Sequence, residues 1–155
     1  MISKGVKSIF PIKNQEIWER YKQHIQSFWT TEEVSLQEDL RDLKTLNDGE
    51  KHFIKNVLAY FANSEAMINE NLASRFYKEI LMPEARCFIS MQMLNESIHA
   101  EMYGLQIEAY VTDPKEKDML FDAIKNVPCI NHKAQWVSKW LNGNQNLLMR
   151  LIGFG

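Results

Sequence analysis

The sequence predicts an all-α protein built as a bundle of long helices. Glycine and proline number only 6 and 4 among 155 residues, so few turn signals interrupt the chain. Apolar residues recur at spacings of three and four along most of it, which is the period of an α-helix with one buried face. The length suits a single domain over residues 1–155 with one hydrophobic core.

The first three predicted helices follow from this spacing and from helix-start signals. Residues 17–29 form the first helix, which ends near Trp29. A short second helix has Ser35 as its N-cap, with Glu38 completing a capping box. A long third helix begins near Asp48. One carboxylate interrupts its apolar stripe, which consists of Ile54, Leu58, Phe61, Glu65, Ile68, Leu72 and Phe76.

A second long helix begins at Pro83, because proline suits the first turn of a helix. One side of it is polar where burial is expected, and carries Phe88, Gln92, Glu96, His99, Tyr103, Gln106 and Tyr110. Asp113-Pro114 begins and Val127-Pro128 ends a helix over residues 114–126. A further helix carries two tryptophans, and residues 147–154 form an apolar segment after an Asn/Gln-rich loop.

Charge and hydropathy exclude several classes of function. The 18 basic and 20 acidic residues give a net charge of -2 without a Lys/Arg block, so nucleic acid is not an expected partner. Apolar runs are too short to cross a bilayer, so no membrane partner is expected. Cys87 and Cys129 show no CxxC or zinc spacing and are expected to be small buried hydrophobes. With no signal-like run in residues 1–10, these features predict a cytoplasmic protein.

Glu65, Glu96 and His99 are the candidate metal ligands. Glu96 and His99 are three residues apart, so on a helix they project from the same face and can ligate one metal ion. Ferritin-like bundles build di-metal sites from such Glu-x-x-His pairs and from single carboxylates on neighbouring helices, and Glu65 fits the second role. A lone Glu-x-x-His match is usually a solvated pair. The metal interpretation is favoured because Glu65 lies within an apolar stripe, where an unpaired charge is costly.

Tyr103 lies one helical turn beyond His99, close enough to exchange an electron and a proton with such metals. The alternative for Tyr103 is a packed core tyrosine with a bonded hydroxyl. Three other histidines have no carboxylate at matching spacing on a buried face, and are expected at the surface: His24, His52 and His132. Carboxylate and imidazole ligands together suit iron or manganese.

Four ordered blocks resemble one known family, the small, radical-generating subunit of class I ribonucleotide reductase in its eukaryotic and viral style. They are Phe28–Val34 (FWTTEEV), Asn69–Leu72 (NENL), Glu84–Phe88 (EARCF) and Glu96–Tyr103 (ESIHAEMY). The resemblance runs from about Pro11 to Gly155 and implies a ferritin-like fold. It also implies a homodimer that works with a separate large catalytic subunit to make deoxyribonucleotides for DNA synthesis.

The resemblance assigns a role to each candidate. Glu65, Glu96 and His99 become ligands of a di-iron centre, and Tyr103 becomes the residue oxidised to a stable tyrosyl radical after the metals react with dioxygen. Trp29 becomes the electron relay between the site and the surface. Most members of the family carry Asp at the position of Glu65, and a subgroup with Glu there uses manganese and iron but replaces the radical tyrosine by Phe. Here Tyr103 is kept, so Fe/Fe is expected and Mn/Fe stays open.

The family pattern also predicts a second half with two further Glu ligands and a second His, and no second Glu-x-x-His lies in these 155 residues. The expected explanation is a truncated chain that supplies three of six ligands. One alternative is a short metal-binding or storage protein in which two chains share a di-iron site. Another is an inactive paralogue that keeps the fold and assists a working subunit.

Overall fold

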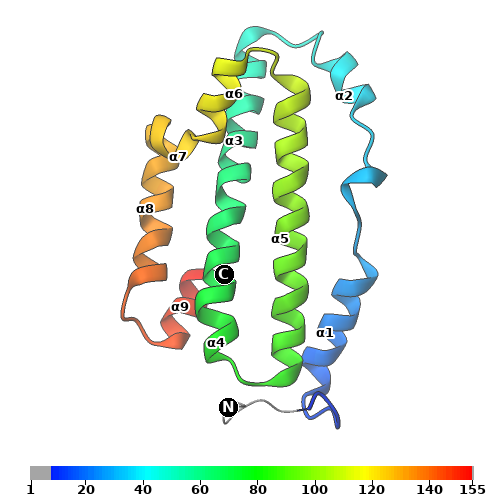
Figure 1. Ribbon diagram of the computed structural model, residues 1–155, viewed down its shortest axis with the longest axis vertical. Coiled ribbons are helices and arrows are strands. Elements are labelled where there is room, and N and C mark those ends of the chain that lie inside the picture. The colour runs from blue at the N-terminus through cyan, green and yellow to red at the C-terminus, as the bar shows by residue number, and fades with distance from the viewer. Residues whose placement is uncertain (1–7, 155) are drawn as a thin grey trace.

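The computed structural model describes residues 8–154, apart from the side chains of residues 141 and 142, and every regular element in that range is helical. The all-α prediction is confirmed. Two long helices, α3 (Asp48–Asn71) and α5 (Pro83–Tyr110), lie side by side and run antiparallel through the middle of the molecule (Figure 1). All three candidate metal ligands are on this pair.

Helix α3 begins where the sequence predicts, because Asn47 and Glu50 form a capping box. The Asn47 side chain accepts from the Glu50 backbone N–H at 3.0 Å, and the Glu50 carboxylate accepts from the Asn47 N–H at 2.8 Å. Beyond Asn71 the helix widens into the π-helical turn η2 (Leu72–Phe76) before the short α4 (Tyr77–Glu79). The apolar spacing gave no sign of this turn, which adds a residue without ending the helix.

The N-terminal segment follows α5 on the side away from α3, through α1 (Gln15–Gln26), η1 (Thr31–Glu33) and α2 (Gln37–Asp42) (Figure 1). The predicted N-cap at Ser35 is wrong. The N-cap of helix α2 is Leu36, one residue later, which puts Glu38 in the second helical position rather than the third. A capping box needs the acidic residue in the third position, so this pair cannot form one.

On the other side of α3 lie α6 (Pro114–Phe121), α7 (Ala123–Asn126), α8 (Pro128–Asn142) and α9 (Leu147–Phe154) (Figure 1). The single helix expected over residues 114–126 is interrupted at Asp122. Asn63 of α3 donates its side-chain amide to the Leu120 carbonyl at 3.1 Å, which satisfies a helix-end acceptor. This contact joins residues far apart in sequence, so local spacing did not predict the break.

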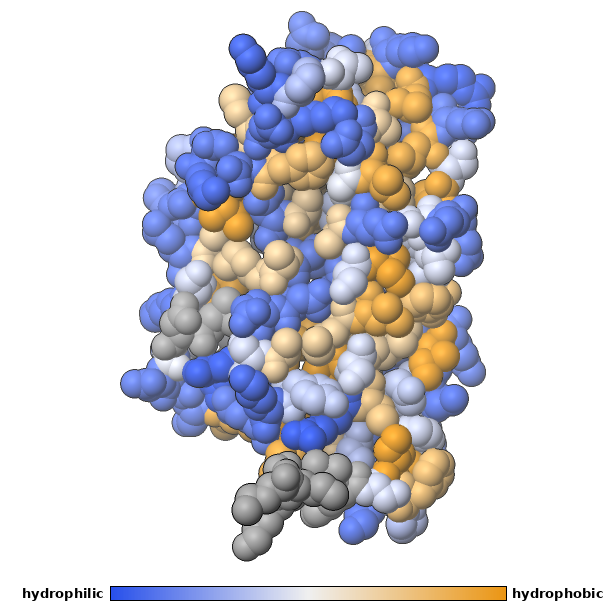
Figure 2. All heavy atoms as spheres, viewed as in Figure 1, coloured by the Kyte–Doolittle hydropathy of each residue, from blue (hydrophilic) through white to orange (hydrophobic). Residues whose placement is uncertain are grey.

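Two clusters of buried side chains hold the helices together. One comprises Leu58, Ala59, Ile107, Val111, Leu120, Ala123 and Ile130, and the other Leu72, Phe76 and Ile89. Figure 2 shows hydrophobic side chains along α5 and between α5 and the N-terminal segment, with polar residues around the rim. Within the described residues, no helix combines the length and apolar character needed to span a membrane.

Candidate metal centre

Glu65 of α3 meets Glu96 and His99 of α5 at one point between the two helices. One ligand atom from each residue lies within 4.8 Å of the others. Glu96 and His99 share a face because three residues make slightly less than one helical turn. Glu65 joins them only because α3 packs against α5 at this level.

Burial strongly affects the Glu65 carboxyl group. Its residue is only 5% exposed, and its Oε2 atom has no hydrogen-bond partner among the described residues. Burial, followed by hydrogen bonding and charge repulsion from Glu96, raises the pKa of Glu65 to about 8. A carboxylate in this position can stay ionised at neutral pH only if a cation compensates its charge.

Glu96 is held by its neighbours on α5. Its Oε2 atom lies 3.2 Å from His99 Nδ1, and its Oε1 accepts from the Gln92 side-chain amide. Gln92 was placed on this polar face by the sequence, but no site role was given to it. The signal was available, because residues four apart on a helix are neighbours.

The donor set fits a divalent transition metal. Two carboxylates and one imidazole supply oxygen and nitrogen ligands of the kind that iron and manganese accept. The uncompensated Oε2 of Glu65 is the kind of buried polar atom that a bound cation would satisfy. His99 is 34% exposed at its side chain, whereas Glu96 is 8% exposed, so the cluster opens toward solvent on the histidine side.

Tyr103 lies on the same face of α5, one turn beyond His99. Its ring stacks on Phe61 of α3, with centroids 5.2 Å apart and planes 19° apart. Burial raises the pKa of Tyr103, and the negative charges of Glu65 and Glu96 raise it further. The phenol is therefore within electrostatic reach of both carboxylates and is protonated at neutral pH.

Trp29 approaches the cluster from outside the α3–α5 pair. It lies just before η1, and its indole stacks on the His99 imidazole with centroids 6.0 Å apart and planes 28° apart. The structure thus brings all five candidate residues to one region. Their spacing in the sequence could not show that Trp29 contacts His99, because the two are seventy positions apart in the chain.

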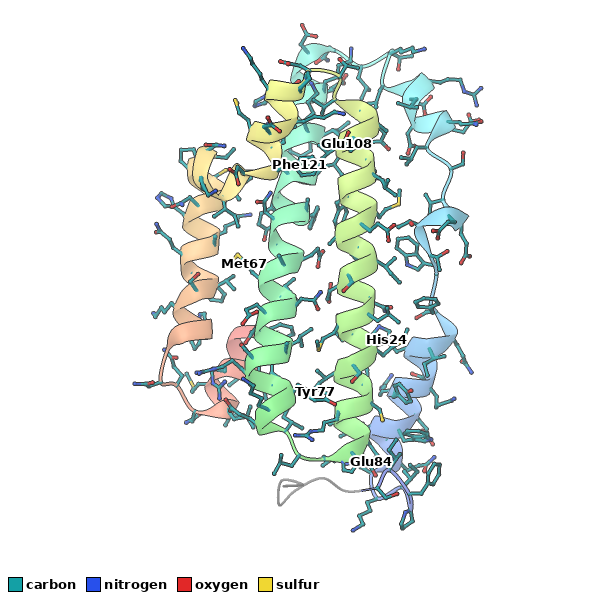
Figure 3. The ribbon with its side chains drawn as sticks, viewed as in Figure 1. His24, Met67, Tyr77, Glu84, Glu108 and Phe121 are labelled. Atoms are coloured by element: carbon teal, nitrogen blue, oxygen red, sulfur yellow. The ribbon has the colours of Figure 1, made fainter. Side chains whose placement is uncertain are left out.

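Two expectations about other residues are wrong. His24 is half-buried between α1 and α5, where Figure 3 labels it, and its ring lies 2.5 Å from the Asn95 side-chain nitrogen. Cys129 is exposed rather than buried, while Cys87 is half-buried. His52 and His132 are exposed, as expected. The His24 prediction failed because its burial depends on packing against α5.

Comparison with known proteins identifies one family throughout. The sequence profile of the family "Ribonucleotide reductase, small chain" matches residues 6–155. A ribonucleoside-diphosphate reductase small subunit of Arabidopsis thaliana is 51% identical over 147 residues, covering 94% of this chain and 44% of that protein. The corresponding protein of Trypanosoma brucei brucei is 47% identical, covering 94% and 43%. The chain therefore spans about half the length of the curated relatives it matches.

Solved structures agree on the fold. The ribonucleotide reductase Rnr4 homodimer of Saccharomyces cerevisiae superposes with a TM-score of 0.78 at 34% identity, covering 92% of this chain and 45% of that one. The dimanganese(II)-NrdF of Streptococcus sanguinis has a TM-score of 0.79 at 20% identity, covering 97% and 52%. The likeness to NrdF shows the helical architecture alone. Together with the likeness to Rnr4, it confirms the predicted ferritin-like fold.

Proposed function

The chain belongs to the ribonucleotide reductase small-chain family, and from this premise we propose that it is part of a radical-generating subunit of ribonucleoside-diphosphate reductase. The observation that carries the proposal is the convergence of Glu65, Glu96 and His99 between two helices, with Tyr103 beside them. A family member without this cluster could keep the fold but could not generate a radical here. The inactive-paralogue alternative is therefore disfavoured for this half of the site.

In this proposal Glu65, Glu96 and His99 hold part of a di-metal centre. When bound, such a centre supplies the dioxygen chemistry that produces a strong one-electron oxidant. We propose iron at both positions, with manganese and iron as the alternative that Glu65 keeps open. Gln92 orients the Glu96 carboxylate through its amide hydrogen bond, so that an oxygen stays directed at the cluster.

Tyr103 is the residue proposed to be oxidised. It would lose one electron to the oxidant and its phenolic proton to a neighbouring acceptor, leaving a neutral tyrosyl radical. Glu65 and Glu96 are the nearby bases, since both act on the pKa of Tyr103. Stacking on Phe61 covers one face of the ring, which slows reaction of a radical with solvent.

Trp29 is the proposed electron relay. Its direct contact with the His99 ring supports this role, because no residue separates the proposed metal ligand His99 from the indole of the N-terminal segment. We further propose that the protein forms a homodimer and passes the radical to a large catalytic subunit, which reduces ribonucleotides to deoxyribonucleotides. The free cysteines favour a reducing cytoplasm as the site of action.

Electron paramagnetic resonance tests the function directly. The full-length native subunit, loaded with iron under anaerobic conditions and then exposed to dioxygen, should give a tyrosyl radical signal. Tyr103→Phe should abolish that signal while keeping the bound iron, because only the phenolic hydroxyl is removed. An unchanged radical signal in Tyr103→Phe would overturn the role of Tyr103, and failure of the wild type to bind metal would overturn the function.

A further inference from the structure

The N-terminal arm, defined as residues 13–39, packs on α5 through apolar side chains that remain partly exposed, such as Ile17, Tyr21 and Ile25. It contains α1, η1 and the start of α2, which are fully described, and Thr31 is the only buried residue within these three helices. Yet the arm carries Trp29, whose indole meets His99. Apolar contacts are not directional, so polar contacts are the candidates for fixing the position of this ring along α5.

Glu84 anchors the beginning of the arm. It lies in the first turn of α5 and is 1% exposed, and its Oε1 accepts backbone N–H groups from Lys13 at 2.6 Å and from Asn14 at 3.2 Å. Asn14 is itself the N-cap of α1, since its side chain accepts from Ile17 N–H at 3.0 Å. Figure 3 shows Glu84 where α5 begins, next to the start of the arm. These N–H bonds lower the pKa of Glu84, so it is a carboxylate.

Tyr110 anchors the end of the arm. Tyr110 is the last residue of α5, and its hydroxyl donates a hydrogen bond to Asp39 Oδ2 at 2.7 Å. Burial and the hydrogen bond to Asp39 raise the pKa of Tyr110 to about 12, so the phenol keeps the proton it donates. The two anchors are about 39 Å apart along α5, at 1.5 Å per residue.

The arm follows α5 in a constant register between these anchors. The Lys13–Glu84, His24–Asn95 and Asp39–Tyr110 hydrogen bonds all join residues 71 positions apart. The two segments therefore run parallel, as Figure 1 shows, and advance together. Trp29 lies between the second and third of these bonds, so a slip at either end would move its ring along α5 relative to His99.

We propose that Glu84 and Tyr110 are positioning residues that hold Trp29 against His99 by fixing the N-terminal arm at both ends of α5. The value of this placement for electron relay rests on the proposed function. The placement itself is a property of the chain alone. It can therefore be measured without metal, dioxygen or the large subunit.

Fluorine NMR of the full metal-free chain labelled with fluorotryptophan measures it. The Trp29 resonance is assigned by its loss in Trp29→Phe. Tyr110→Phe removes one hydroxyl, and should shift and broaden the Trp29 resonance while leaving those of Trp136 and Trp140 unchanged. Tyr77→Phe is the matched control, because the Tyr77 hydroxyl makes no hydrogen bond to any described residue and lies at the other end of α5 (Figure 3).

Hydrogen exchange gives the size of the effect. Backbone amides of residues 28–36 should exchange about tenfold faster in Tyr110→Phe, as expected for loss of a hydrogen bond to a charged acceptor. Glu84→Ala should accelerate exchange in residues 13–20 and also shift the Trp29 resonance. Both effects should be smaller in Glu84→Gln than in Glu84→Ala, because the glutamine amide oxygen can still accept a hydrogen bond from a backbone N–H. Asp39→Ala, at an exposed residue, removes the acceptor of the same hydrogen bond and should have the same effects as Tyr110→Phe.

The outcomes separate the two proposals. An unchanged Trp29 resonance with unchanged exchange in both Tyr110→Phe and Asp39→Ala overturns the positioning role. Loss of the Trp136 and Trp140 resonances as well would show global unfolding, and would overturn a role confined to the arm. A wild-type chain that shows these effects but forms no radical keeps the positioning inference and rejects the proposed function.

Discussion

The indole of Trp29 stacks on the imidazole of His99, with ring centroids 6.0 Å apart and planes 28° apart. Trp29 lies just before η1 in the N-terminal segment, whereas His99 belongs to the long helix α5. The contact therefore joins two segments that lie far apart in the sequence. Its geometry depends on how the arm is placed along α5.

Replacing Trp29 by Phe should separate relay from metal binding. The variant should bind as much metal as the wild type, because the indole supplies no ligand. Nucleotide reduction in the presence of the large subunit should fall by at least about a hundredfold, a loss typical of removing one essential group. Metal analysis and turnover assays on the same preparation check both parts. Full turnover in Trp29→Phe would reject the relay role.

Replacing Glu96 by Ala should reduce bound metal to the background level, because Glu96 is one of the three proposed ligands that α3 and α5 bring together. Metal content by elemental analysis after iron loading is the measurement. Glu101→Ala is the control, since Glu101 is an exposed carboxylate on the same helix. Wild-type metal content in Glu96→Ala would show that the cluster is not the site.

Counting metals against chains tests the storage alternative. If two chains of this sequence share one centre, native protein should hold one di-metal site per pair of these chains. The proposed subunit should instead hold one di-metal site per longer chain, because the remaining ligands then come from the same polypeptide. Native mass spectrometry of protein purified from its source, with metal retained, distinguishes the two stoichiometries.

The stability of the metal-free protein should fall as pH rises through the titration of Glu65. The pKa of Glu65 is about 8 in the folded state and returns to the ordinary carboxyl range, near 4.5, on unfolding. Between these values the folded state binds the extra proton, so the Glu65 contribution is fully present below the lower value and lost above the higher one. Urea unfolding at several pH values measures this. Glu65→Gln should flatten the dependence over this window, and equal slopes in both proteins would contradict it.

Truncating Phe76 should destabilise the fold severely. Phe76 is 2% exposed, is the last residue of the π-helical turn, and packs in the cluster with Leu72 and Ile89. Phe76→Ala should lower the free energy of unfolding by about 3–5 kcal/mol, the cost of losing a buried aromatic ring. Phe53→Ala, at a residue 69% exposed, should change it by less than about 0.5 kcal/mol. Chemical denaturation of both variants gives the comparison.

The sequence by itself determined the helical class, the starts of the two long helices and the pairing of Glu96 with His99 on one face. The helix starts at Asp48 and Pro83 are predicted by signals in neighbouring residues. The shared face of Glu96 and His99 follows from the helical period, which places residues three apart on one side. Glu65 could be singled out because a carboxylate interrupted an apolar stripe. All of these signals lie within a few residues of one another, which is the range over which backbone geometry is fixed.

Only the tertiary structure decided which of these faces meet. It brought Glu65 to Glu96, turned His24 inward and divided at Asp122 the helix expected over residues 114–126. The placement of Trp29 on His99 depends on hydrogen bonds that span 71 residues. Such contacts depend on the packing of whole helices, and sequence spacing carries no information about the register between two helices until they are packed together.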